Sequence, residues 1–180
     1  MSMAHQRKKE PEKVRLKLIE SACRLAMENG LAGVNVEAVA AEAGVSRGGL
    51  VHHFPSKQVL VESVFRHMLT GFESDLAARM SADPEPSGRF TRVYILSVFD
   101  SGAHAQWGPL WIATATDPQL RKIWGEWFND QVMRHGETAP LLEIARFAAD
   151  GVWMGQIYGV VPGHAEALRN HLINMTTPGK

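Results

Sequence analysis

The stretch AGVSRGGLVHHFPSK, residues 43–57, brings cationic, hydroxyl and glycine residues together in a short span. An arginine has a planar fork of donors that fits O6 and N7 of guanine, whereas a lysine offers a point charge to phosphates. Backbone amides at the start of a helix also bind phosphate, and glycines let the backbone approach a groove wall closely. We therefore predict a DNA-contacting surface made of Ser46, Arg47, Gly48, Gly49, His52, His53 and Lys57.

Each of these assignments has a simpler alternative. In the simpler interpretation, Arg47 and Lys57 are solvated surface residues that contact nothing, and His53 packs under Phe54. The basic residues 7–9 are open to two interpretations, a flexible solubilising arm over residues 1–10 or a reader of the minor groove.

Catalytic and metal chemistry find little support in the sequence. Asp100 and His104 are spaced to share one helix face, but no nucleophile motif, phosphate loop or metal-ligand cluster accompanies them. The adjacent His52 and His53 diverge by about 100° on a helix, so they would not share an ion. Cys23 falls among apolar positions and is expected to pack in the core. We expect neither an enzyme nor a bound cofactor.

All five tryptophans lie beyond residue 100, which is a high density for a helical segment. Most of these rings are expected to fill a core, together with Phe147, Met154 and Tyr158. Indole N–H groups need partners when buried, so a concave aromatic pocket is the other interpretation. The predicted effector pocket consists of Phe99, His104, Trp107, Trp111, Trp124, Trp127, Met133 and Trp153, with Asp100, Gln106 and Gln156 as further polar candidates.

Apolar residues recur every three to four positions almost throughout, and no alternating strand pattern appears, so the fold is expected to be all-α. Helices are predicted over residues 11–29, 36–43, 47–53, 56–79, 88–102, 106–115, 118–135, 140–160 and 164–175. Gly30 ends the first of them, Asn35 and Ser46 cap the two short helices, and Asp117-Pro118 starts another.

Gly44 separates two short helices at the spacing of a helix-turn-helix. Ala40 lies four residues before it and Leu50 six residues after it, so Val39, Ala43 and Leu50 should form a small core between a support helix and a recognition helix. Alanine-rich helical hairpins imitate this spacing, so it favours DNA binding without proving it.

Residues 11–65 as a whole resemble the N-terminal domain of TetR-family transcriptional regulators, whose pattern runs "G…T…IA..AGVS.G.LY.HF.SK..L". Two positions differ: Val51 replaces the usual tyrosine, and Asn35 or Val36 replaces the usual threonine. Val51 cannot donate a hydrogen bond to phosphate. The positions that match are Gly30, Val39-Ala40, Ala43-Gly44-Val45-Ser46, Gly48, Leu50, His53-Phe54, Ser56-Lys57 and Leu60.

The resemblance implies a DNA-binding domain over residues 1–55 and a helical effector and dimerisation domain over residues 56–180. It implies a homodimer formed through residues 140–175, a palindromic operator on double-stranded DNA, and a small-molecule effector that releases a repressor. The small residues Ala145, Ala148, Ala149, Gly151 and Gly155 are expected to line the dimer interface. The alternative is a helical ligand-binding or scaffold protein with weakened DNA affinity, which Val51 favours.

The charge of the chain is unevenly distributed. The formal net charge of the 180 residues is zero, but residues 1–60 carry nine Lys/Arg against six Asp/Glu. A mildly basic N-terminal third agrees with a nucleic-acid partner. The single cysteine, the absence of an apolar run behind the basic N-terminus and the absence of a long apolar stretch favour a cytoplasmic protein without a membrane partner.

Overall fold

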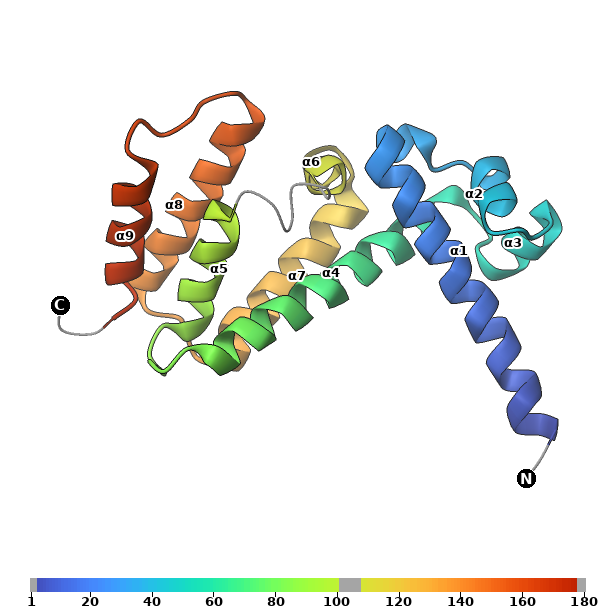
Figure 1. The fold of residues 1–180 in the computed structure, drawn as a ribbon, viewed down its shortest axis with the longest axis horizontal. Helices are drawn as coiled ribbons and strands as arrows, with labels where there is room; N and C mark the ends of the chain where they lie inside the picture. Colours follow the sequence, from blue (N-terminus) through green and yellow to red (C-terminus); the bar gives the residue numbers. More distant parts are fainter. Residues whose placement is uncertain (1–2, 101–107, 178–180) are drawn as a thin grey trace. The chain divides into compact units, whose positions relative to one another are not determined.

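The computed structural model describes residues 3–100 and 108–177, and these residues form helices without any strand (Figure 1). The all-α prediction is therefore confirmed. The helices are α1 (Met3–Gly33), α2 (Val36–Glu42), α3 (Arg47–His53), α4 (Lys57–Ala82), α5 (Arg89–Phe99), α6 (Gly108–Thr116), α7 (Pro118–His135), α8 (Pro140–Ile157) and α9 (Ala165–Asn174). No described helix is long and apolar enough to cross a bilayer.

The first helix departs from its prediction at one end. It begins at Met3 rather than after a flexible arm of ten residues, with Pro11 inside it. At the other end, Gly30 has φ 65° and ψ −171°, so the regular helix breaks at the glycine that the sequence marks. Cys23 is buried on this helix, and burial with the nearby Glu20 raises the pKa of its thiol to about 11. The thiol therefore stays protonated at neutral pH, as a packing residue does.

The described chain packs as two compact units. The first takes Met1–Thr70 and Gln106–Ile123, and the second takes Gly71–Ala105 and Trp124–Lys180. The boundaries of these units fall inside α4 and α7. They describe packing alone, so the functional division between residues 55 and 56 stays a prediction.

In the first unit, α1 contacts α2 and α6, and α2 contacts α3. Leu18, Ala22, Leu50 and Phe54 are completely buried in its core. The ring of Trp111 on α6 meets Phe65 edge-on at 5.7 Å. This core supports the short α3, whose glycines give it little helix preference of its own.

The second unit is built on α5, which contacts α8 and α9, and these two helices contact each other. Seven of the eleven residues of α5 are buried, including Phe90, Val93 and Ile95. The carboxylate of the buried Glu137 accepts hydrogen bonds of 2.8 Å from the backbone N–H groups of Phe90 and Thr91. A side chain far along the chain thus satisfies the free donors at the start of α5.

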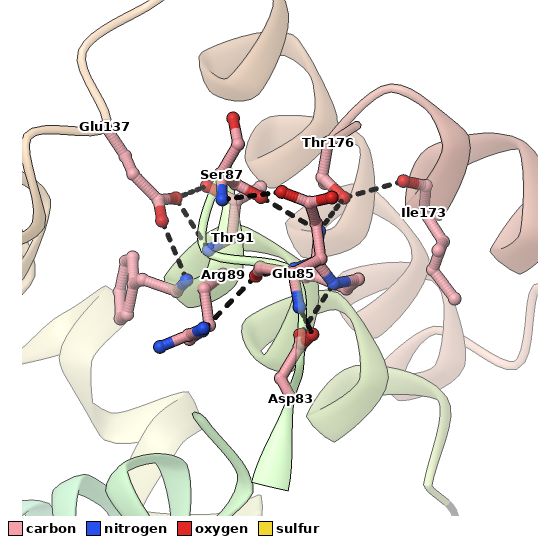
Figure 2. Close-up of polar contacts among 10 residues, drawn as sticks. Asp83, Glu85, Ser87, Arg89, Thr91, Glu137, Ile173 and Thr176 are labelled. Carbon is pink, nitrogen blue, oxygen red and sulfur yellow. Dashed lines mark hydrogen bonds and ion pairs between the residues drawn. The ribbon is translucent and has the colours of Figure 1, made fainter. Parts of the chain in front are cut away.

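The loop before α5 is fixed by a second polar network (Figure 2). The guanidinium of Arg92 donates to the carboxylate of Asp83 at 2.7 Å and to Oγ1 of Thr176 at 2.8 Å. Gly88 has φ 63°, and a Cβ there would lie 2.3 Å from the carbonyl oxygen of Thr176. Only glycine fits this position, so the loop and the C-terminal end of α9 are held in close contact.

Candidate DNA-binding and effector sites

The helix-turn-helix forms as the spacing predicts. The side chain of Asn35 accepts from the backbone N–H of Ala38 at 2.8 Å, and Oγ of Ser46 accepts from the N–H of Gly49 at 3.0 Å. Gly44 makes the turn with φ 64°, and Val45 donates back to the carbonyl of Ala40 at 2.9 Å. Both caps therefore belong to the residues that the sequence marks.

The small core under these helices is also confirmed. Val39, Ala43 and Leu50 are completely buried, and Ala40 is 4% exposed. A helix of seven residues is marginal in isolation, so α3 depends on this packing.

The predicted DNA-contacting residues lie on the opposite, solvated side of the same element. Ser46, Arg47, Gly48, His52 and Lys57 are exposed. Gly49 and His53 are half-buried, and the rings of His52 and His53 meet edge-on at 5.4 Å. Lys57 is the first residue of α4, directly after the turn that follows α3. These residues thus form a continuous stretch around α3, and their contact with DNA stays a prediction.

The two glycines of this surface differ in the space around them: Gly48 has room for a Cβ, whereas Gly49 lies tightly against the side chain of Ser46. A Cβ on Gly48 would meet nothing closer than Oγ of Ser46 at 4.0 Å, and a Cβ on Gly49 would lie 3.3 Å from the same atom. Neither has a positive φ. At Gly48, packing within the described residues does not require a glycine.

Three charged residues beside this surface were missed by sequence reasoning. Glu37 on α2 pairs with Arg47, with 3.4 Å between Oε1 and Nε. The guanidinium of Arg15 lies 4.9 Å from the ring centre of Phe54 and donates to Oγ of Ser63 at 3.1 Å. Nζ of Lys17 lies close to the turn glycine Gly44. These contacts join different helices, and no local pattern in the sequence announces them.

The residues predicted for an effector pocket separate into different surroundings. His104 and Trp107 lie outside the described residues. Trp111 packs in the first unit, whereas Trp124, Trp127 and Trp153 belong to the second unit. Phe99 and Trp153 are half-buried. Met133 is 69% exposed, so burial gives its predicted place in a pocket no support. It lies on the solvated side of α7.

A cluster of aromatic rings does form in the second unit. The indoles of Trp124 and Trp127 stack at 5.0 Å between ring centres, and Phe128 lies 5.6 Å from Trp124. Phe128 also meets Tyr94 at 5.4 Å. Nε1 of Trp127 donates to the carboxylate of Glu73 at 3.2 Å. The cluster therefore joins α4, α5 and α7, and it has a carboxylate at its Trp127 end.

A second carboxyl lies at the Tyr94 end of this cluster. The hydroxyl of Tyr94 donates a hydrogen bond to Asp150 of α8. Burial raises the pKa of Asp150 above its ordinary value, although the Tyr94 hydroxyl and the charge of Arg146 act in the opposite direction. Burial and the charge of Asp150 likewise raise the pKa of Tyr94. An ionised Asp150 is thus poorly solvated here and would gain from a nearby cation.

The positive charge of Arg146 is not enough to stabilise an ionised Asp150, because it is shared with other carboxyls. Its Nη1 donates to Oγ1 of Thr91 at 2.6 Å, and that hydroxyl donates to Glu137 at 2.6 Å. Arg146 and Glu137 are 4% and 5% exposed. Burial lowers the pKa of Arg146, and the charges of three carboxylates, Glu137, Glu143 and Asp150, act in the opposite direction.

The apolar side chains of α8 also differ from expectation. Phe147 is 67% exposed and Tyr158 is 75% exposed, so neither fills the core. Ala145 and Ala149, which were expected to line a dimer interface, are completely buried instead. The buried side of α8 thus carries Ala145, Ala149 and Val152, whereas Ile144 and Phe147 lie on its exposed side, Gly151 is exposed and Gly155 is half-buried.

Known proteins resemble the chain over both parts. A family model described as "Bacterial regulatory proteins, tetR family" matches residues 18–64, and one described as "Tetracyclin repressor-like, C-terminal domain" matches residues 88–177, which is half of the chain. The HTH-type transcriptional regulator BetI of Burkholderia cenocepacia (strain HI2424) is 29% identical over 114 residues, 61% of this chain and 59% of BetI. BetI of Ectopseudomonas mendocina (strain ymp) is 27% identical over 158 residues, 78% of this chain and 80% of that protein. The chain thus spans less than two thirds of the Burkholderia relative.

Solved structures share the fold. The multidrug binding protein EbrR in complex with imidazole has a TM-score of 0.72 at 24% identity, covering 94% of this chain and 93% of that chain. A transcriptional regulator from Saccharomonospora viridis in complex with choline has a TM-score of 0.69 at 19% identity, covering 91% and 95%. With both family models matched and the helix-turn-helix formed, the chain belongs to the TetR family of DNA-binding transcriptional regulators, which are not enzymes.

Proposed function

We propose that the protein is a homodimeric repressor that leaves a palindromic operator when a small apolar or aromatic effector binds. The observation that carries this proposal is the exposed surface of α3, on which Arg47 and Gly48 lie over a completely buried Leu50. Residues 1–55 would bind DNA, and residues 56–180 would bind the effector and the second subunit.

On the operator, α3 would enter the major groove. Arg47 would contact a guanine edge or a phosphate, while Lys57, Ser46 and the amides at the start of α3 would hold the backbone. His52 would replace the phosphate contact that Val51, 43% exposed, cannot make. Two recognition helices of a dimer would then read half-sites about 34–36 Å apart.

The dimer would form through the large apolar side chains of α8 and the segment after it. In a single chain these side chains are open to solvent, which costs about 25 cal/mol for each Å² of apolar surface that a partner could cover. A symmetric partner would bury the same patch twice. The residues are Leu141 (51% exposed), Ile144 (57%), Phe147 (67%), Tyr158 (75%), Val160 (66%) and Val161 (72%).

The effector would bind beside the aromatic cluster, which consists of Trp124, Trp127, Phe128 and Tyr94. EbrR has been solved with imidazole, malachite green, ethidium and proflavin, and the Saccharomonospora viridis regulator with choline. These relatives support an effector with aromatic or cationic character. The poorly solvated Asp150 beside Tyr94 favours a positive charge, because aromatic faces and a buried carboxylate both attract cations.

Release would follow from a population shift. An effector that binds more tightly to the arrangement unable to span the operator moves the dimer into that arrangement. A difference of about 1.4 kcal/mol in effector affinity between the two arrangements changes operator occupancy tenfold.

Selection from a random duplex library tests the DNA-binding part of the proposal. The full chain should enrich a near-palindromic sequence, and binding to it should weaken steeply with salt. Arg47→Ala should relax base preference, whereas Lys57→Ala should weaken binding to all sequences and lower the salt slope. Binding without sequence preference would instead support the alternative, a ligand-binding or scaffold protein with weakened DNA affinity.

Imidazole and choline, neither of which intercalates into duplex DNA, then test the effector. Adding either to the complex with the enriched DNA should release the DNA at concentrations that quench tryptophan fluorescence. Quenching without release would show a ligand site that is not coupled to DNA binding.

A further inference from the structure

An acidic residue lies against the arginine that is proposed to read DNA. Oε1 of Glu37, in the first turn of α2, is 3.4 Å from Nε of Arg47, the first residue of α3. Their side chains are 65% and 74% exposed, so the pair lies on the open side of the helix-turn-helix. The pair therefore joins the support helix to the recognition helix on the surface that would meet DNA.

This pair contributes little to the stability of the fold, since exposed ion pairs rarely do. Its effect is on the freedom of Arg47. A long arginine side chain samples many rotamers, and each rotamer that misses the base edge lowers the chance of a productive contact. The closest approach uses Nε, so the two terminal nitrogens stay available for O6 and N7 of a guanine.

The charge of Glu37 acts on affinity in the opposite direction. A carboxylate close to a recognition helix repels phosphates and weakens binding to DNA of any sequence. Glu42, the other acidic residue of α2, pairs with Arg24 of α1 at 3.0 Å and not with Arg47. It therefore does not orient Arg47. A carboxylate at the place of Glu37 would thus lower general affinity while it orients Arg47.

We propose that Glu37 is a positioning residue for DNA specificity, which holds Arg47 for guanine and disfavours non-operator DNA. The inference rests on the proposed function, because it requires that Arg47 reads a base. It predicts that removing the Glu37 charge changes general affinity and sequence discrimination in opposite directions.

The test compares the full-length wild type with Glu37→Gln, Arg47→Ala and the double variant on the selected operator and on a scrambled duplex at fixed salt. Glu42→Gln is the matched control, because it removes the same charge from the same helix. A good bidentate arginine–guanine pair discriminates by about 5-fold to 150-fold. Glu37→Gln should lower discrimination at one guanine by about threefold or more while binding to the scrambled duplex stays equal or tightens.

The pattern across variants decides the matter. Since Glu37 acts through Arg47, Glu37→Gln should have no further effect on base preference in the Arg47→Ala background. Equal discrimination in Glu37→Gln and Glu42→Gln would overturn the inference while leaving Arg47 as the reader. Unchanged base preference in Arg47→Ala would overturn both this inference and the proposed role of Arg47. Circular dichroism of each variant separates these outcomes from loss of folding.

Discussion

Replacing Gly48 by alanine separates the stability of the recognition helix from its fit to DNA. Gly48 is in α3 without a positive φ, and a Cβ there would meet only Oγ of Ser46 at 4.0 Å, which is ordinary van der Waals contact. The methyl group therefore fits the free protein. If the fold alone determined this residue, alanine would be the better choice.

The expected change in stability follows from helix preference. Alanine is favoured over glycine by about 0.8–1 kcal/mol in a helix interior, and Gly48 lies in the first turn, so we expect a gain of about 0.5–1 kcal/mol in the free energy of unfolding. Gly71→Ala is the matched control, because Gly71 is an exposed glycine of α4 at which an added Cβ would meet nothing within 4 Å. Both variants should gain similar stability in urea denaturation.

DNA binding should distinguish the two variants. If the backbone of α3 approaches the groove at Gly48, the methyl group holds it off, and we expect Gly48→Ala to bind the selected operator about tenfold more weakly, or about 1.4 kcal/mol. Gly71→Ala should bind as the wild type does. A fluorescence anisotropy titration measures both. Operator binding by Gly48→Ala that equals or exceeds that of the wild type would refute the argument that this glycine serves the approach to DNA.

Three further perturbations test other parts of the structure. Phe147→Asp should weaken the dimer by about 3 kcal/mol or more, because the symmetric interface loses two rings. Met133→Asp is the control, since Met133 is about equally exposed but lies on α7, and this variant should dimerise as the wild type does. Sedimentation equilibrium measures both, and a Phe147→Asp variant that remains dimeric would show that this patch is not the dimer interface. Asp150→Asn should weaken binding of choline and ethidium in calorimetry. Burial raises the pKa of Asp150, so at pH values just above its ordinary pKa the carboxyl is protonated in the native state and ionised in the unfolded state. The free energy of unfolding of the wild type should therefore fall as pH rises through this range, and the variant should lose this dependence. Gly88→Ala should lower the free energy of unfolding by about 2 kcal/mol or more because a Cβ meets Thr176 at a positive φ, and an unchanged urea midpoint would contradict this.

Local signals in the sequence determined the helix-turn-helix and most helix boundaries. Asn35 and Ser46 cap the helices that they precede, Gly44 makes the turn, and Oδ1 of Asp117 accepts from the backbone N–H of Gln119 at 2.8 Å. The reason is that a cap or a tight turn involves atoms only two to five residues apart. The start of α1 was predicted less well. By propensity alone a proline belongs in the first turn of a helix, so the sequence predicts a start at Pro11, but in the structure this residue lies inside the helix.

The burial of α8 could not be predicted from its sequence. Apolar residues occur on all sides of this helix, so periodicity does not say which side faces the core. Packing against α5 buries Ala145 and Ala149 and leaves Ile144 and Phe147 open. Phe147 was expected inside and Ala145 and Ala149 at an interface, and the structure has these three residues the other way round.

By itself, then, the sequence determined that the chain is helical, that residues 36–53 form a helix-turn-helix, and which side chains border its recognition helix. These properties depend on backbone preferences and on contacts close along the chain. Only the tertiary structure decided that Glu37 meets Arg47, that Tyr94 meets Asp150 and that Glu137 caps α5. Such pairs join residues on different helices, so they exist only after the helices have packed and brought distant polar groups within hydrogen-bonding or ionic distance.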